Sequence, residues 1–231
     1  MIFFYNFQMP LVVLLCLLGL AAVTGLRHGW SSSFRLSKTT RNMQLSCSVP
    51  EKVEVVEFTG RGCVLLAHQG EHDHFLHKAA VLICENDDKR GSSGVILGRP
   101  SAFTLGETAP NMPSPMQPNT LFMGGKDGQD MAMMFHKHEF GGSSKYIGNG
   151  IYVGALKEAR EALEARVEGV HPRDFKFIFN NVEWPPGALE KEIAEGRWDV
   201  VRMPPDMVLQ QKGSSAEAIW GKARLAIGAN K

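Results

Sequence analysis

The chain has 231 residues, of which 44% are hydrophobic and 21% are charged, and its formal net charge is +1. The first fifty positions hold four basic residues and no acidic one, so 21 basic and 24 acidic side chains remain in the rest of the chain. This mildly acidic body disfavours a broad phosphate-binding surface, and we do not expect direct binding of nucleic acid.

The first fifty residues have the composition of a two-part targeting leader. Leu11 to Val23 is a run of about 13 apolar residues, which suits a signal-peptide core and is short for a membrane span. We expect a signal peptide over residues 1–25 and a disordered, transit-peptide-like segment rich in Ser, Thr and Arg over residues 26–50. This order predicts delivery to a plastid of the algal type, with secretion as the alternative. We expect no membrane association of the mature domain.

Three aliphatic runs in the first part of the body predict strands, at Cys63 to Ala67, Ala79 to Cys84 and Val95 to Leu97. The connection from His68 to Lys78 is polar and rich in histidine. The connection over residues 86–94 is rich in turn-forming residues, and we expect a loop there.

The middle of the chain is divided by proline and glycine. Ala109 to Thr120 contains four prolines and is expected to form an extended surface loop. Leu121 to Met123 predicts a short strand that ends at Gly124-Gly125. Met131 to His138 fits a strand better than a helix, and Tyr146 to Val153 predicts a strand with a Gly-Asn-Gly interruption.

Ala155 to Glu168 predicts the longest helix, with an apolar stripe that runs from Leu156 to Val167. In the next segment Phe175, Phe177 and Phe179 alternate with other residues, which predicts a strand with one aromatic face.

Phe179 to Val201 reads as the end of a strand, a rigid Pro185-Pro186 turn, a short helix that ends at Gly196, and a new strand. A last helix is expected to begin near Ser214, whose spacing from Glu217 is that of a capping box. Strand clusters mixed with isolated helices favour an α+β fold over a doubly wound sheet.

Cys63 and Cys84 are the cysteines of the body, and both lie in apolar runs. Such residues are usually buried small hydrophobic side chains, and two cysteines are too few for a disulfide framework. A single bridge between them is the alternative if their strands pair.

Several separated motifs occur in one order along the body. They are Leu65-Leu66-Ala67, Asp73, Ala80-Val81-Leu82-Ile83-Cys84-Glu85, Gly94-Val95-Ile96-Leu97 with Pro100, Phe122-Met123-Gly124-Gly125, and finally Trp184, Gly187, Leu189-Glu190, Glu192-Ile193 and Trp198. In these motifs the chain resembles the AlgH/YqgE family of bacterial and plastid-bearing eukaryotic proteins. The resemblance covers about Gly62 to Ala226.

The resemblance implies one compact α+β domain over residues 51–231, with a mixed sheet in an unusual, barrel-like arrangement and flanking helices. Family members carry the label of transcriptional regulators, and no catalytic apparatus is established for them. The chain departs from the bacterial pattern at Gly98-Arg99, Lys126 and Ala188, where bacterial members have Asn-Lys, Pro and Gln. Because these polar groups differ, a bacterial ligand need not be shared.

A group of histidines, His68, His72, His74 and His77, lies near the carboxylates of Glu71 and Asp73. Imidazole and carboxylate groups can bind Zn²⁺, and His136 and His138 offer further ligands. The spacing matches no known metal motif, so a solvated loop is favoured over a metal site. Asp73 then serves as a helix cap or turn acceptor.

Other chemical motifs are weak. Gly148 to Gly154 has the glycines of a dinucleotide-binding loop, but Ile-Tyr-Val between them is strand-like. The serines beside glycines form no Gly-x-Ser-x-Gly elbow. Lys89, Arg90 and Arg99 form either a local basic patch or an ordinary charged surface.

The absence of an assembled nucleophile, base or metal pattern favours a non-enzymatic regulatory domain that binds a small ligand or a protein partner without a cofactor. An uncharacterised hydrolase-like enzyme and a metal-binding protein are the alternatives. The candidate cleft consists of Asp73, Arg99, Gly124, Gly125, Trp184 and Glu190. Within it, Glu190 beside Trp184 is the residue most worth testing for binding.

Overall fold

The computed structural model describes residues 49–228 except 58, 69, 71–74 and 214. The leader predicted over residues 1–25 and 26–50 lies almost wholly outside these residues, and its division stays a prediction. In the described part of the chain, no helix combines the length and the apolar character needed to cross a membrane.

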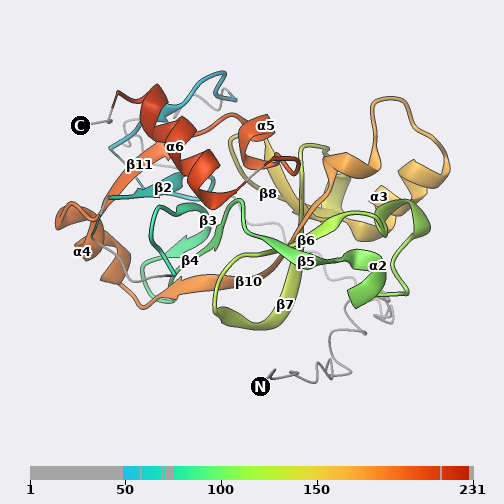
Figure 1. Ribbon diagram of the computed structural model, residues 1–231, viewed down its shortest axis with the longest axis horizontal. Coiled ribbons are helices and arrows are strands. Elements are labelled where there is room, and N and C mark those ends of the chain that lie inside the picture. The colour runs from blue at the N-terminus through green and yellow to red at the C-terminus, as the bar shows by residue number, and fades with distance from the viewer. Residues whose placement is uncertain (1–48, 58, 69, 71–74, 214, 229–231) are drawn as a thin grey trace, which may run out of the picture. The chain divides into compact units, whose positions relative to one another are not determined.

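The described elements are strands with short helices between some of them (Figure 1). The strands are β1 (Glu54–Val55), β2 (Val64–Ala67), β3 (Ala80–Asp87), β4 (Gly91–Ile96), β5 (Pro100–Thr104), β6 (Thr120–Met123), β7 (Asp127–His136), β8 (Ser144–Gly148), β9 (Ile151–Gly154), β10 (Lys176–Trp184) and β11 (Trp198–Arg202). The helices are α2 (Leu105–Thr108), α3 (Leu156–Glu164), α4 (Ala188–Ala194), α5 (Pro205–Val208) and α6 (Ala216–Ala226), with short 3-10 turns η1 (Ser114–Met116), η2 (Gly141–Ser143) and η3 (Pro172–Asp174).

An antiparallel group of strands has the order β1-β11-β2-β3-β4. In its centre, β2 is fully buried and β3 is buried from Ala80 to Cys84, as these apolar runs predict. The loop predicted over residues 86–94 is wrong in extent, because β3 and β4 continue through most of it as a hairpin. Polar strand ends are tolerated there since Ser92 donates a hydrogen bond to Asn86 across the pair.

Strand β10 joins this group to the rest of the sheet. Its end pairs with β4, whereas its first part lies between β6, in parallel, and β7, in antiparallel orientation. Figure 1 shows β10 running across both groups of strands. A bulge at Asn180, where φ is 62°, separates the two parts. Alternate pairing along one long strand therefore produces an α+β fold with a mixed sheet.

The sheet curls but does not close by backbone pairing in the described residues. Strand β8 is the last strand in the order of the sheet, next to β9. The turn of the β8–β9 hairpin nevertheless contacts the segment just before β2. Asn149 Nδ2 donates to the carbonyl of Gly62 at 2.6 Å, and a Cβ on Gly62 would collide with the backbone of Gly148. Asn149 and Gly150 both have positive φ, at 52° and 75°, which identifies a tight hairpin turn and not a dinucleotide-binding loop.

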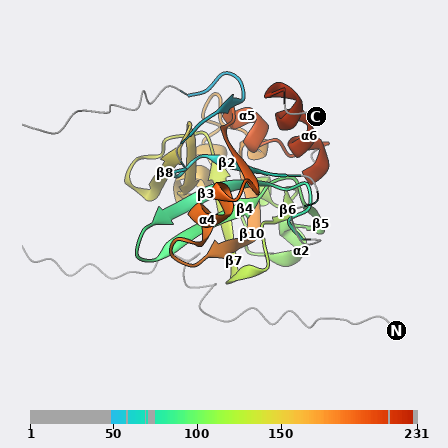
Figure 2. The ribbon, with the colours of Figure 1, turned by 90° about the vertical axis from the view of Figure 1, so that its left-hand side faces the viewer.

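Helices cover the sheet, and the long helix α3 is shorter than the sequence predicts. Helix α3 ends at Glu164 because Arg166 adopts a left-handed conformation, and Val167 is exposed. Helix α6 begins at Ala216 with Ser215 as its cap, one residue after the predicted Ser214, which is outside the described residues. It packs on β2 and β3 (Figure 2).

Candidate functional site

The candidate residues Arg99, Gly124 and Gly125 serve packing. The Arg99 guanidinium lies 4.7 Å from the centre of the Phe75 ring and donates a hydrogen bond to the Phe75 carbonyl. A Cβ on Gly125 would overlap the backbone carbonyl of Asn181, and one on Gly124 would overlap that of Asn180. The double glycine therefore permits close approach of two chain segments. Asp73 lies outside the described residues.

The two tryptophans are linked by Glu192 and not by Glu190. Trp184 Nε1 and Trp198 Nε1 donate to Glu192 Oε2 at 3.2 and 2.8 Å, and Arg197 donates to Glu192 Oε1 at 3.0 Å. The indole rings pack edge to face, with centroids 6.2 Å apart. Glu192 thus satisfies two buried donors and is the central acceptor of this unit, which the sequence left unassigned.

Glu190 is exposed and faces away from this arrangement. It lines a small hollow of about 200 Å³ together with Asp87, Asp88, Gly91 and Ser92. Of the described members of the predicted cleft, Glu190 lines this hollow, whereas Arg99 contacts Phe75 and the double glycine contacts Asn180 and Asn181.

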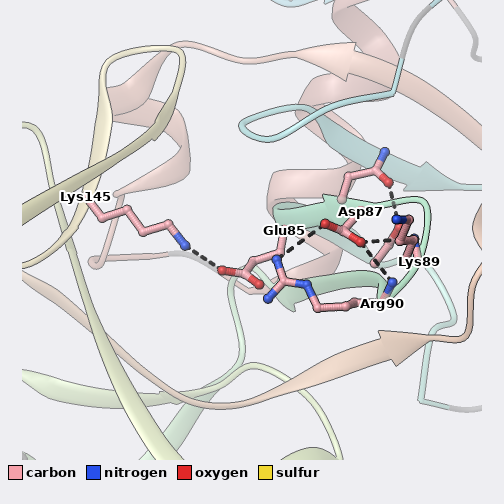
Figure 3. Close-up of polar contacts among 7 residues, drawn as sticks. Glu85, Asp87, Lys89, Arg90 and Lys145 are labelled. Atoms are coloured by element: carbon pink, nitrogen blue, oxygen red, sulfur yellow. Dashed lines mark hydrogen bonds and ion pairs between the residues drawn. The ribbon is translucent and has the colours of Figure 1, made fainter. Parts of the chain in front are cut away.

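Arg90 of the suggested basic patch pairs with Asp87, with 3.5 Å between Arg90 Nη2 and Asp87 Oδ2. The backbone N–H groups of Lys89 and Arg90 donate to Asp87, and these bonds hold the pKa of the Asp87 carboxyl below its usual value (Figure 3). Lys145 Nζ lies 2.5 Å from Glu85 Oε1 and lowers the pKa of Glu85. These pairs form a charged surface between β3 and β8.

A larger cavity lies elsewhere, with a volume of about 860 Å³. We refer to it as the cleft. It is bordered by the start of β6, the residue after β7, the η3 turn and the segment that follows α5. Its lining residues are Pro115, Pro118, Asn119, Thr120, Lys137, His171, Pro172, Arg173, Asp174, Asp206, Leu209, Gln210, Gln211 and Lys212. Its size falls in the range of small-molecule sites.

Two side-chain amides hold the lining of the cleft in place. Asn119 is buried and donates to the carbonyls of Pro172 and Phe175 at 2.8 and 3.0 Å. Gln211 donates to the carbonyls of Arg173 and Phe175 at 2.7 and 3.0 Å. The η3 turn is therefore attached both to the loop before β6 and to the segment after α5.

Lys176 lies behind this lining with 1% of its surface exposed. Its Nζ donates to the carbonyls of Val208 and Gln210 at 2.9 and 3.1 Å and lies 4.7 Å from the centre of the Phe122 ring. Burial lowers the pKa of Lys176 to about 7. The side chain thus fixes the segment after α5 from within the core.

A histidine and an aspartate meet at the edge of the cleft. His138 Nε2 lies 2.8 Å from Asp174 Oδ2, which also accepts from the backbone N–H of His171 at 2.9 Å. Such a pair can orient a general base. In the described part of the chain, no serine, threonine or cysteine side chain is hydrogen-bonded to His138.

The histidine cluster, for which a metal site is the less favoured alternative, is only partly described. His72 and His74 lie outside the described residues, and His68 Nε2 lies 3.1 Å from Asp199 Oδ2, which also accepts from Arg224. Within the described ranges, no group of three or more His, Cys, Asp or Glu side chains is placed to hold a metal ion.

The two cysteines of the body are buried and form no disulfide with each other. Burial raises the pKa of the Cys63 thiol, and it raises the pKa of the Cys84 thiol to about 12. Neither sulfur has the thiolate character that a nucleophile needs.

Sequence comparison relates residues 64–231 to one family, described as AlgH-like. A UPF0301 protein of Xylella fastidiosa is 30% identical over 171 residues, which cover 71% of this chain and 87% of the relative. A UPF0301 protein of Stenotrophomonas maltophilia is 29% identical over 139 residues, 58% of this chain and 72% of the relative.

Solved structures show the same fold. A Corynebacterium diphtheriae protein has a TM-score of 0.59 at 22% identity, covering 71% of this chain and 85% of its own. The AlgH protein of Pseudomonas aeruginosa has a TM-score of 0.55 at 19% identity, covering 73% and 89%. Because its match spans most of the body, the chain belongs to the AlgH-like family.

Proposed function

We propose that this protein is a non-enzymatic binding domain that takes a small ligand in the cleft. The observation that carries this proposal is the cleft itself, whose lining is held by hydrogen bonds from Asn119, Lys176 and Gln211. A preformed cavity with polar groups of fixed position reduces the ordering that a ligand must impose. The burial of both body cysteines agrees with a binding role.

The family label adds a regulatory role to this proposal. Ligand binding in the cleft would change how the domain contacts a protein partner and so influence gene expression. The acidic balance of the body favours action through such a partner over direct contact with DNA.

The test blocks the cleft without touching its supports. The purified full chain is equilibrated with a soluble small-molecule extract, and retained compounds are measured by mass spectrometry. Thr120→Trp places an indole at the lining of the cleft, whereas Leu225→Trp adds one to an exposed site on α6. The proposal expects a compound that wild type and Leu225→Trp retain unchanged and Thr120→Trp does not.

Loss of this compound from both variants, or from neither, contradicts a ligand site in the cleft. If wild type retains no compound, Thr120→Trp is also compared with wild type for binding of a protein partner. A partner that is blocked only by Thr120→Trp would mean that the cleft binds protein and not a small ligand.

A hydrolase-like function is the second candidate, and the His138–Asp174 pair favours it. This function requires that a retained compound is converted and that His138→Gln abolishes the conversion. Conversion by wild type that stops in this variant would overturn the non-enzymatic assignment.

We also propose that the leader directs the protein to a plastid, since an apolar run precedes an acid-free segment rich in Ser, Thr and Arg. A fluorescent protein placed after residues 1–50 should accumulate in plastids of an alga with extra envelope membranes. Secretion of the reporter would support the alternative.

A further inference from the structure

The charges at the cleft differ from those of the body around it. The body carries 21 basic and 24 acidic residues, but the lining of the cleft contains Lys137, Arg173 and Lys212 against Asp174 and Asp206. His171 lies there as well. An excess of positive charge inside a cleft of an acidic domain concentrates anions at that place.

Both carboxylates of the lining already have partners. Asp174 Oδ2 accepts from His138 and from the backbone of His171. Asp206 Oδ1 lies 3.8 Å from Lys137 Nζ. For Arg173 and Lys212, the described part of the chain offers no carboxylate at ion-pair distance. These two cations are thus free to pair with a ligand.

The backbone brings the two free cations to one side of the cleft. Gln211, the neighbour of Lys212, donates to the carbonyl of Arg173 at 2.7 Å. Gln210 donates to the carbonyl of Lys212 at 2.9 Å and fixes the turn that carries it. Each cationic residue is therefore anchored through its main chain, which leaves the long side chain to reach a ligand.

Part of the lining of the cleft is apolar. Pro115 and Pro118, before β6, and Leu209, in the segment after α5, supply this apolar wall. Such a wall suits the carbon body of a small molecule, whereas an inorganic ion alone would leave most of the volume of about 860 Å³ to water.

We infer that the ligand of the cleft is a small organic anion whose phosphate or carboxylate group is bound by Arg173 and Lys212. A guanidinium offers paired donors that match either anionic group, and an ammonium adds a compact charge. This inference rests on the proposed function and narrows it to one chemical class.

The probes for the test are ribose 5-phosphate and citrate, with uncharged ribose as the neutral counterpart. Binding to the purified full chain is measured by calorimetric titration at low and at high salt. The double variant Arg173→Glu with Lys212→Glu reverses the two charges of the cleft. The control is the double variant Lys157→Glu with Lys222→Glu, which makes the same change of net charge at exposed sites outside the lining of the cleft. Thermal unfolding confirms that each variant is folded.

We expect at least one of the two anions to bind, at least tenfold more tightly than ribose and more weakly as salt increases. The double reversal in the cleft should weaken this binding at least tenfold, and the control pair should change it less than threefold. A phosphate site favours ribose 5-phosphate over citrate, and a carboxylate site shows the opposite order.

Three results overturn the inference: neither anion binds, ribose binds as tightly as the anions, or the control pair weakens binding as much as the cleft pair. The proposed function survives these results if Thr120→Trp still abolishes retention of a neutral or cationic compound. The cleft is excluded as a binding site only if anion binding does not depend on Arg173 and Lys212 and Thr120→Trp also leaves compound retention unchanged.

Discussion

The tryptophan unit around Glu192 and the cleft around Lys176 each contain one charged side chain that other residues cover. They differ in how many residues of sequence separate the hydrogen-bonded partners. Glu192 meets Trp198 and Trp184 at separations of six and eight residues. Lys176 meets Val208 at 32 residues, and Asn119 meets Phe175 at 56. The conspicuous local motif is therefore scaffold, whereas the cavity is assembled from distant segments that no local motif marks.

The largest expected effect is at the junction of the two regions, where Gly125 passes the backbone of β10. Gly125→Ala puts a Cβ into the carbonyl of Asn181, so one segment must move. We expect a loss of about 3 kcal/mol or more in the free energy of unfolding. Urea denaturation measures it. Gly142→Ala, where a Cβ would meet no atom within 4 Å, should change stability little, and equal losses in both variants would contradict this explanation.

Glu192 tests whether the tryptophan unit is scaffold. Glu192→Ala removes an acceptor of two indole N–H groups and of Arg197, and we expect it to reduce stability by about 2–3 kcal/mol. Glu190→Ala is the matched control on the exposed face of α4 and should cost less than about 0.5 kcal/mol. Chemical denaturation with tryptophan fluorescence reports both. If Glu190→Ala were the more damaging change, the roles of the two glutamates would be reversed.

The pH dependence of stability tests the buried amino group of Lys176 behind the cleft. Its folded pKa of about 7 is below the ordinary 10.5, so the unfolded chain binds more protons between these values. The stability of wild type relative to Lys176→Met should therefore rise with pH, by about 2 kcal/mol between pH 7 and pH 8.5.

Parallel denaturation series at several pH values measure this difference. Lys222→Met, which removes an exposed ammonium, should show almost no such change. A difference between wild type and Lys176→Met that does not vary over this range would mean that Lys176 titrates as an ordinary lysine.

The smallest effect is expected for the surface pair Glu85–Lys145, which belongs to neither region. Both side chains are about half exposed, so a double-mutant cycle with Glu85→Gln and Lys145→Met should give a coupling of about 0.5 kcal/mol. Because Lys145 lowers the pKa of Glu85, the coupling should persist above the ordinary glutamate pKa and disappear as acid protonates Glu85. A coupling energy as large as the stability loss expected for Glu192→Ala would show that this surface pair is structurally as important as the tryptophan unit.

Local sequence patterns were sufficient for most elements of the fold. Apolar runs with turn residues at their ends mark β2, β3 and β6, and the segment from β10 through α4 to β11 follows from Pro185-Pro186, Gly196 and the aromatic alternation. These features depend on backbone propensity and on burial of one face, which neighbouring residues determine. The family motifs likewise identify the α+β class.

The sequence alone did not show which side chains meet. It named Glu190 beside Trp184 as the residue to test for binding, and the direction of the side chains along α4 makes Glu192 the acceptor of the indole N–H groups. Val167 was placed in an apolar stripe, although the left-handed Arg166 ends α3 before it.

The primary structure by itself determined the strand and helix segments, the family and the unequal charge of leader and body. Only the tertiary structure decided that Lys176, in a strand with an aromatic face, is buried under Val208 and Gln210, and that Arg173 and Lys212 border one cleft. The physical reason is that a local pattern records the preference of each segment for water or core. Which distant carbonyl accepts from a buried ammonium is settled only when those segments pack.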